Sequence, residues 1–137
     1  MKTILLNSGS RSGSDFFQSL LDGHPQILQF PGIIKTNKKL IKILSSGNGN
    51  DISSNFIKIY PHFFDSRLAK AERHYMLGKN KNQYYLVDQE KFKMNFLKMF
   101  EKKSKINANN RLYEIILILH QAYSLTCGHD ISKKKIM

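Results

Sequence analysis

The pattern of apolar and polar positions changes twice within the first 32 residues. The run TILLN (3–7) precedes glycines and is typical of a buried parallel strand. The next segment, 14–25, places apolar residues at i, i+1, i+4 and i+5 from Phe16, which predicts a helix that a Gly and a Pro end. QILQFPG (26–32) then predicts a second short strand that a Pro-Gly turn ends.

Helical patterns dominate the middle of the chain. Residues 36–47 predict a short helix that Gly47 stops, and 55–60 predict another that Pro61 ends. Asp51 or Ser53 is the expected N-cap of this second helix, because short oxygen-bearing side chains accept from free backbone N–H groups.

Two stronger helical patterns follow. Residues 84–88 (YYLVD) are strand-like or an extended lead-in, and Asp88 is the expected cap of an amphipathic helix built around Phe92. Residues 109–128 predict a long helix that is apolar almost all round, with Gly128 as its C-cap. Such a helix is normally buried between other elements.

The order strand, glycine loop, helix, strand and then helices indicates an α/β fold. We expect a P-loop-type parallel sheet flanked by helices, incomplete and helix-rich in its second half. The 137 residues fit one domain, 1–137.

Composition adds three expectations. The longest apolar stretch, 115–119, is too short to span a bilayer, and the N-terminus lacks the pattern of a secretory signal. We therefore expect a soluble, cytoplasmic protein without a membrane span. The single cysteine, Cys127, excludes an internal disulfide and a multi-cysteine metal site, and is expected to be a buried small hydrophobe.

The net charge of +12 is unevenly distributed. Residues 1–34 are neutral, so the whole excess lies in 35–137, which suggests an anionic partner such as a phosphorylated small molecule. Because 18 of the 22 basic residues are Lys, the bias also matches an AT-rich coding sequence. A basic balance alone is weak evidence, and we expect no nucleic-acid partner.

The stretch SGSRSGS (8–14) has the parts of a phosphate-binding loop. Gly9 and Gly13 allow the backbone to turn and to approach a ligand, and serine hydroxyls supply donors. Arg11 supplies a charged fork that matches two phosphate oxygens. The start of the following helix adds the positive end of its dipole. The stretch is not a Walker A loop, because Ser14 stands where that motif has Lys.

The segment SGSRSGSDFFQSLLDGHPQI resembles the 5′-phosphosulfate loop of sulfotransferases, and its LLDGHP ending is similar to their bacterial and protein-tyrosine branches. The resemblance is contiguous over residues 4–27. It implies 3′-phosphoadenosine 5′-phosphosulfate (PAPS) as the donor of a sulfonate group, in-line transfer to a hydroxyl or amine acceptor, and no metal.

The resemblance also implies roles for individual loop residues. Arg11 takes the place of the loop cation that holds the 5′-phosphate and sulfonyl oxygens and stabilises charge on the leaving phosphate. The residues expected to contact the donor are Ser10, Arg11, Ser12, Gly13, Ser14 and Asp15. Asp15 departs from the family, which often has Thr or Ser there.

The expected catalytic base has no clear counterpart. Many relatives have a Glu shortly after His-Pro, whereas this chain has QILQFPGII. His62 is the candidate base by residue type and rough distance, with a packed aromatic-cluster histidine as the alternative. The other histidines (His24, His74, His120 and His129) lack the spacing of metal ligands.

The family's 3′-phosphate segment, opened by Arg-Asp-Pro or Arg-Asn-Pro, is absent from this sequence. The resemblance therefore implies a sulfotransferase-like domain that is truncated, the N-terminal part of a bacterial member, possessing half of the donor site. Two alternatives stay open: another nucleotide-dependent P-loop transferase of the kinase type, or a non-catalytic basic interaction fragment.

Overall fold

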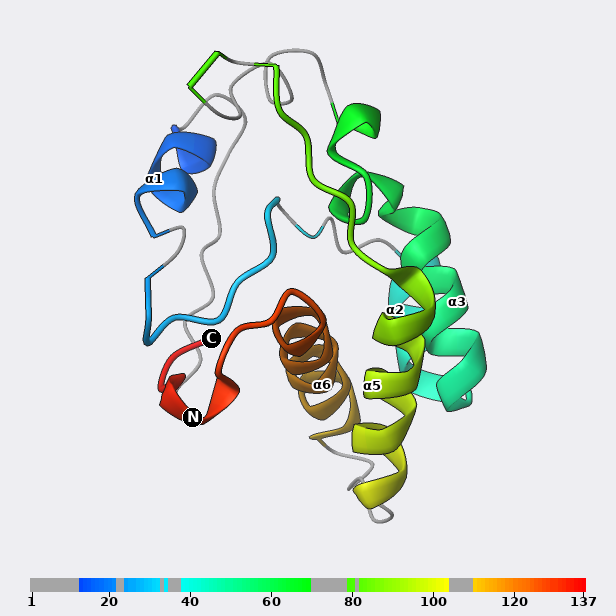
Figure 1. The fold of residues 1–137 in the computed structure, drawn as a ribbon. Coiled ribbons are helices and arrows are strands. Elements are labelled where there is room, and N and C mark those ends of the chain that lie inside the picture. The colour runs from blue at the N-terminus through cyan, green and yellow to red at the C-terminus, as the bar shows by residue number, and fades with distance from the viewer. Residues whose placement is uncertain are drawn as a thin grey trace.

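The computed structural model describes residues 13–21, 24–32, 34, 38–69, 79–80, 82–103 and 110–137. In this part of the chain it is all-α, with five α-helices, three 3-10 turns and no strand. Figure 1 shows α1 (Ser14–Leu20) on one side of the molecule and the other four α-helices gathered on the other side. The extended segment 24–32 connects the two parts.

The helical cluster consists of four α-helices that pack against one another. They are α2 (Lys38–Ser46), α3 (Gly49–Ile59), α5 (Gln89–Lys102) and α6 (Arg111–Thr126). The long α5 lies along α6, α3 packs on α5, and α2 contacts both α3 and α6 (Figure 1).

Aromatic side chains form the centre of this cluster. Phe30, from the extended segment, stacks on Phe63 with ring centroids 5.2 Å apart and lies 5.2 Å from Phe56. Phe92 and Phe96 of α5 complete the aromatic core and are fully buried. Burial of each such ring contributes about 2 kcal/mol or more through the hydrophobic effect.

One buried hydrogen bond fixes the register of α6 against this core. The Tyr123 hydroxyl donates to the Phe63 carbonyl at 2.5 Å, across 60 residues of sequence. Burial raises the pKa of the Tyr123 phenol, so it stays protonated and remains a donor.

The extended segments are held by isolated bridges. Ile27 pairs with Ile136 in parallel, and the Leu28 N–H donates to the Ile136 carbonyl at 2.8 Å. Asp65 pairs with Leu86 in the antiparallel sense.

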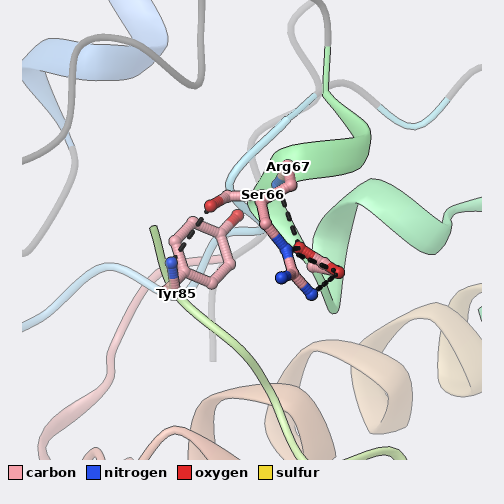
Figure 2. Close-up of polar contacts among 4 residues, drawn as sticks. Ser66, Arg67 and Tyr85 are labelled. Atoms are coloured by element: carbon pink, nitrogen blue, oxygen red, sulfur yellow. Dashed lines mark hydrogen bonds and ion pairs between the residues drawn. The ribbon is translucent and has the colours of Figure 1, made fainter. Parts of the chain in front are cut away.

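A second set of contacts joins the 82–88 segment to the turn η2 (Ser66–Leu68), as Figure 2 shows. The Tyr85 N–H donates to the Ser66 hydroxyl at 3.0 Å, and the Ser66 N–H donates to the Tyr85 carbonyl at 3.2 Å. Arg67 donates to both carboxylate oxygens of Asp65, and this hydrogen bonding holds the pKa of the Asp65 carboxyl below its ordinary value.

The expected α/β fold is wrong for the described part of the chain. Segment 26–32 is extended, but one parallel bridge to Ile136 does not make a sheet, and Pro31 has no N–H with which to continue a ladder. The strand-like residues 84–88 likewise make one bridge, at Leu86, and then lead into α5. The predicted strand 3–7 lies outside the described residues.

Most of the predicted helices are confirmed, with shifted ends. The 36–47 and 109–128 predictions correspond to α2 and α6, and Gly128 follows α6 with φ +84°. Asp88 caps α5 by accepting from the Lys91 N–H at 2.9 Å. Helix α1 ends at Leu20, before Gly23 and Pro25, the residues predicted to stop it.

The predicted cap of α3 is wrong. The helix begins at Gly49 and is capped by Asn48, whose side chain accepts from the Asp51 N–H at 2.9 Å. Ser53 lies inside the helix instead, buried, and its hydroxyl donates to the Gly49 carbonyl at 3.0 Å. Asn and Asp are comparable caps, so the sequence alone did not separate them.

Candidate functional site

The predicted phosphate-binding loop is described only at its end. Ser10, Arg11 and Ser12 lie outside the described residues. Gly13 has φ +74°, the left-handed conformation that favours glycine, and α1 begins at the next residue. The Phe17 N–H donates to the Gly13 carbonyl at 2.9 Å, so Gly13 leads directly into the helix. Ser14 and Asp15 belong to the first turn of α1, and their side chains are not among those described.

Helix α1 is fixed by polar contacts with the extended segment. The Gln18 side-chain amide donates to the Phe30 carbonyl at 2.8 Å, and the Gln29 amide donates back to the Gln18 carbonyl at 3.3 Å. The apolar residues that predicted this helix remain exposed, with Phe16 at 69% and Leu20 at 63%. The described side chains of α1 are therefore held by hydrogen bonds more than by burial.

His62, the candidate base, lies in the 3-10 turn η1 (Pro61–Phe63). Its half-buried ring is edge-on to Phe63, with centroids 4.6 Å apart, and 6.1 Å from the Tyr60 ring. The turn directly follows α3, which lies on the opposite side of the molecule from α1 in Figure 1. Its role as a base stays a prediction.

His120 is a buried histidine of α6 whose pKa is strongly perturbed. Its Nδ1 lies 2.8 Å from the Ile116 carbonyl, and its ring centroid is 4.0 Å from that of Phe30. Burial against this apolar surface lowers the pKa of His120 to about 4, despite the opposing effect of the carbonyl. It is therefore neutral at pH 7 and serves packing.

No metal site is present in the part of the chain that the structure describes, because no three His, Cys, Asp or Glu side chains converge there. His24 makes a local contact instead, its Nδ1 accepting from the Gln26 N–H at 3.2 Å. His74 lies outside the described residues.

The described residues line a half-open cavity of about 520 Å³. Five segments form its walls: the extended residues 27–31, the lead-in 85–88, the first turn of α5, the last turn of α6 and the C-terminal residues 129–134. Its apolar wall includes Ile27, Pro31 and Val87, and its polar lining includes Lys91, Ser124, Cys127, His129 and Lys134. Cavities of this size accommodate small organic ligands.

Ser124 is one of the polar groups of the cavity. It is 5% exposed, and its backbone carbonyl accepts from the His129 N–H at 3.0 Å. The hydroxyl of the neighbouring Thr126 donates to the Ala122 carbonyl at 2.7 Å and accepts from Asn95 at 3.1 Å. Among the described residues, the buried side-chain polar atom without a hydrogen-bond partner is Nε of Arg111.

Cys127 also lines this cavity, and its expected burial is wrong, because it is exposed at the end of α6. Partial desolvation nevertheless raises the pKa of the Cys127 thiol, while the Tyr123 hydroxyl and the Lys91 ammonium act in the opposite direction. The thiol is thus the resident form at pH 7.

Nothing in the sequence pattern predicts this cavity. Its residues come from five separate segments, and Asp88 and Cys127 were singled out for capping and burial alone. No short motif connects Lys91 with Ser124. The sequence feature most closely related to the cavity is a pair of small polar residues, Ser124 and Thr126, at the end of an otherwise apolar helix.

Helices that could cross a membrane are not found among the described residues, because none combines the required length with sufficient hydropathy. Comparison of the whole chain with protein-family models, curated protein sequences and solved structures finds no match. The likeness to sulfotransferases therefore rests on the sequence of residues 4–27 alone and stays a prediction.

Proposed function

We propose that residues 8–15 bind the 5′-phosphosulfate group of PAPS and that the protein is a sulfotransferase acting on a hydroxyl or amine acceptor. The observation that carries the proposal is the φ of +74° at Gly13, one residue before α1. A phosphate-binding loop between glycines needs a left-handed residue at this point, since it turns the following amides toward one side.

The sequence around Gly13 supports the same reading. A left-handed residue followed by right-handed helical residues makes a concave set of backbone N–H groups, which favours anions. Arg11 is two residues away and carries the planar fork that suits two oxygens of one phosphate group. When bound, the donor supplies the sulfonate group that is transferred.

Nucleotide titration tests the proposal. The protein is titrated with adenosine 3′,5′-bisphosphate and with ATP by isothermal calorimetry. We expect binding of the bisphosphate and weaker binding of ATP, because the loop lacks the Walker A lysine. Arg11→Ala should remove bisphosphate binding, whereas Arg11→Lys should retain part of it, because the charge remains and the fork is lost.

Arg67→Ala is the matched control, because Arg67 is an exposed arginine paired with Asp65 and distant in sequence from the loop. It should leave the bisphosphate affinity unchanged. Equal affinity for the two nucleotides, or Arg11→Ala binding as tightly as the wild type, would overturn the proposal. Tighter binding of ATP would favour the kinase-type alternative instead.

A further inference from the structure

The extended segment 82–88 has one paired edge and one edge that pairs with none of the residues that the structure describes. We infer that the unpaired edge binds an extended, acidic segment of a partner protein as an added β-strand. Three observations carry the inference: the direction of the backbone groups at Leu86, the course of the cavity along this edge, and the positive charge of the chain. None of these observations involves residues 8–15.

Two hydrogen bonds fix the direction of the Leu86 backbone groups. On the paired edge, which Figure 2 shows at Tyr85, the Ser66 N–H donates to the Tyr85 carbonyl at 3.2 Å. The Val87 N–H donates to the Phe64 carbonyl at 2.8 Å. Leu86 lies between these bonds, in the non-hydrogen-bonded position of the antiparallel bridge. Its own N–H and C=O therefore point to the other edge, where no described residue bonds to them.

The unpaired edge is accessible to a partner. Leu86 is 62% exposed and Tyr84, two residues before it, is 53% exposed. Residues two apart in a strand direct their side chains to the same face, so the two exposed side chains flank one stretch of edge. Proteins usually block such an edge with proline or lysine, whereas residues 84–87 (YYLV) contain neither. A strand edge of this kind binds extended peptides through main-chain hydrogen bonds.

The half-open cavity follows this edge. Four successive residues, 85–88, line it. One face of a strand presents only alternate residues, so a successive run indicates that the cavity meets the edge of the segment. Alternate residues of the other extended segment, Ile27, Gln29 and Pro31, also line it and present one of their faces to it. The volume of about 520 Å³ therefore provides room for a chain beside Leu86.

The charge of the chain favours an acidic partner segment. The net charge is +12, and Lys91 and Lys134 line the cavity. The nearby carboxylates are already engaged, because Asp65 pairs with Arg67 and Asp88 caps α5. Exposed lysines act through long-range attraction that steers an acidic segment toward the edge, and salt screens this attraction. The main-chain groups of Leu86 then supply the directional bonds.

Fluorescence anisotropy with a defined peptide tests the inference. The probe is a fluorescein-labelled nonapeptide with alternating valine and threonine in its centre and two aspartates at each end. N-methylation of its five central backbone amides removes the main-chain donors and keeps the charge, and should weaken binding about tenfold or more. Replacement of the four aspartates by lysines should weaken binding about fivefold or more at low salt.

Two substitutions at one position separate the backbone from the side chain. Leu86→Pro removes the free N–H, and the paired edge keeps its bonds because that N–H takes no part in them. Leu86→Ala retains the N–H and removes the exposed side chain. We expect Leu86→Pro to weaken binding of the probe about tenfold and Leu86→Ala to weaken it less than about threefold. The urea midpoints of both variants establish that they are folded.

Amide hydrogen exchange of the wild-type protein provides a second measurement that needs no variant. The saturating probe should slow exchange of the Leu86 amide about tenfold or more, whereas the Val87 amide, already bonded to Phe64, should change less. No binding at millimolar probe, equal binding of the N-methylated peptide, or binding without slower exchange at Leu86 would overturn the inference. Equal binding of the aspartate and lysine peptides would overturn the acidic class of the partner.

Discussion

The helical cluster buries its phenylalanine side chains, whereas the α1 region exposes them. Phe56, Phe63 and Phe92 are at most 1% exposed, whereas Phe16 of α1 is 69% exposed and Phe17 is 46% exposed. Both regions show a clear helical spacing of apolar residues. The difference lies in the partners: α5 and α6 bury their apolar faces against each other, whereas α1 is connected through Gln18 to a backbone carbonyl.

This difference indicates that the two regions have separate stabilities. A helix that buries an apolar face contributes to the cooperative core, while one held by exposed or half-buried hydrogen bonds opens at a lower free energy. If residues 8–15 bind a nucleotide, the helix that follows them belongs to the less stable region. Ligand-binding segments often have a low free energy of local unfolding.

The largest effect on the free energy of unfolding is expected from removing the Phe30 ring. Phe30 packs in the aromatic core, and its backbone carbonyl accepts from Gln18 of α1. Phe30→Ala removes a side chain that is 2% exposed and contacts the rings of Phe56, Phe63 and Tyr123. We expect a loss of about 3–5 kcal/mol in the free energy of unfolding, from lost transfer energy and a residual cavity. Urea denaturation followed by far-UV circular dichroism measures it.

Phe16→Ala is the matched control, because the same ring is deleted at a position that is 69% exposed. It should change the free energy of unfolding by less than about 0.5 kcal/mol. Comparable losses in the two variants would show that α1 is buried as deeply as the core and would remove the contrast between the regions.

The second effect is a dependence of stability on pH that His120 introduces into the cluster. Its pKa is lowered to about 4 in the folded state, against 6.5 for an unperturbed imidazole. Between these values the unfolded chain binds a proton that the folded protein does not, so stability is full above pH 6.5 and falls as the pH approaches 4. The shift corresponds to at most about 3 kcal/mol.

Denaturation midpoints measured from pH 7 to pH 4 test this dependence. His120→Gln should flatten the curve within this window, whereas His129→Gln, at an exposed position, should retain it. The paired carboxyls of Asp65 and Asp130 have lowered pKa values and contribute at more acidic pH, so they do not account for the same window. A wild-type curve that is flat from pH 6.5 to 4 would contradict the assignment.

The third effect concerns the polar contact inside the core. Tyr123→Phe keeps the ring and removes the donor to the buried Phe63 carbonyl, now 2.5 Å from the hydroxyl oxygen. We expect a loss of about 1–3 kcal/mol, because a buried acceptor is left unsatisfied. Tyr84→Phe, at an exposed tyrosine, should have almost no effect on the urea midpoint, and equal midpoints for the two variants would argue against this role.

The helical cluster was largely predictable because its signals are local. The spacing of Phe92 and Phe96 defines α5, and Asp88 marks its start, so both the helix and its cap follow from neighbouring residues. The prediction of a sheet was wrong because strand pairing is not a local property. Residues 26–32 are apolar and extended as expected, but whether an extended segment joins a sheet depends on distant partners, here one bridge to Ile136.

The two candidate sites also differ in whether their residues are neighbours in the sequence. The loop 8–15 is contiguous, so the sequence indicates it, and its role in binding stays a prediction. The cavity assembles Lys91, Ser124 and Lys134 from three separate segments, and only the folded chain brings them together. The exposure of Cys127 escaped prediction for the same reason, since it depends on what packs beyond the end of α6.

The smallest expected effect tests most directly whether α1 and the helical cluster open separately. Gln18→Ala removes the hydrogen bond from the Gln18 amide to the Phe30 carbonyl, which is worth about 1 kcal/mol. Amide hydrogen exchange in α1 should become about fivefold faster, as measured by mass spectrometry or NMR, while exchange in α5 and α6 stays unchanged.

Gln83→Ala, at an exposed glutamine in the 82–85 segment, provides the control and should leave α1 exchange as it is in the wild type. If Gln18→Ala instead accelerates exchange in α6 as much as in α1, the two regions open together. The exposed Phe16 and Phe17 would then belong to the same cooperative unit as the buried core, and a loop at Gly13 would be as rigidly supported as the cavity beside Ser124.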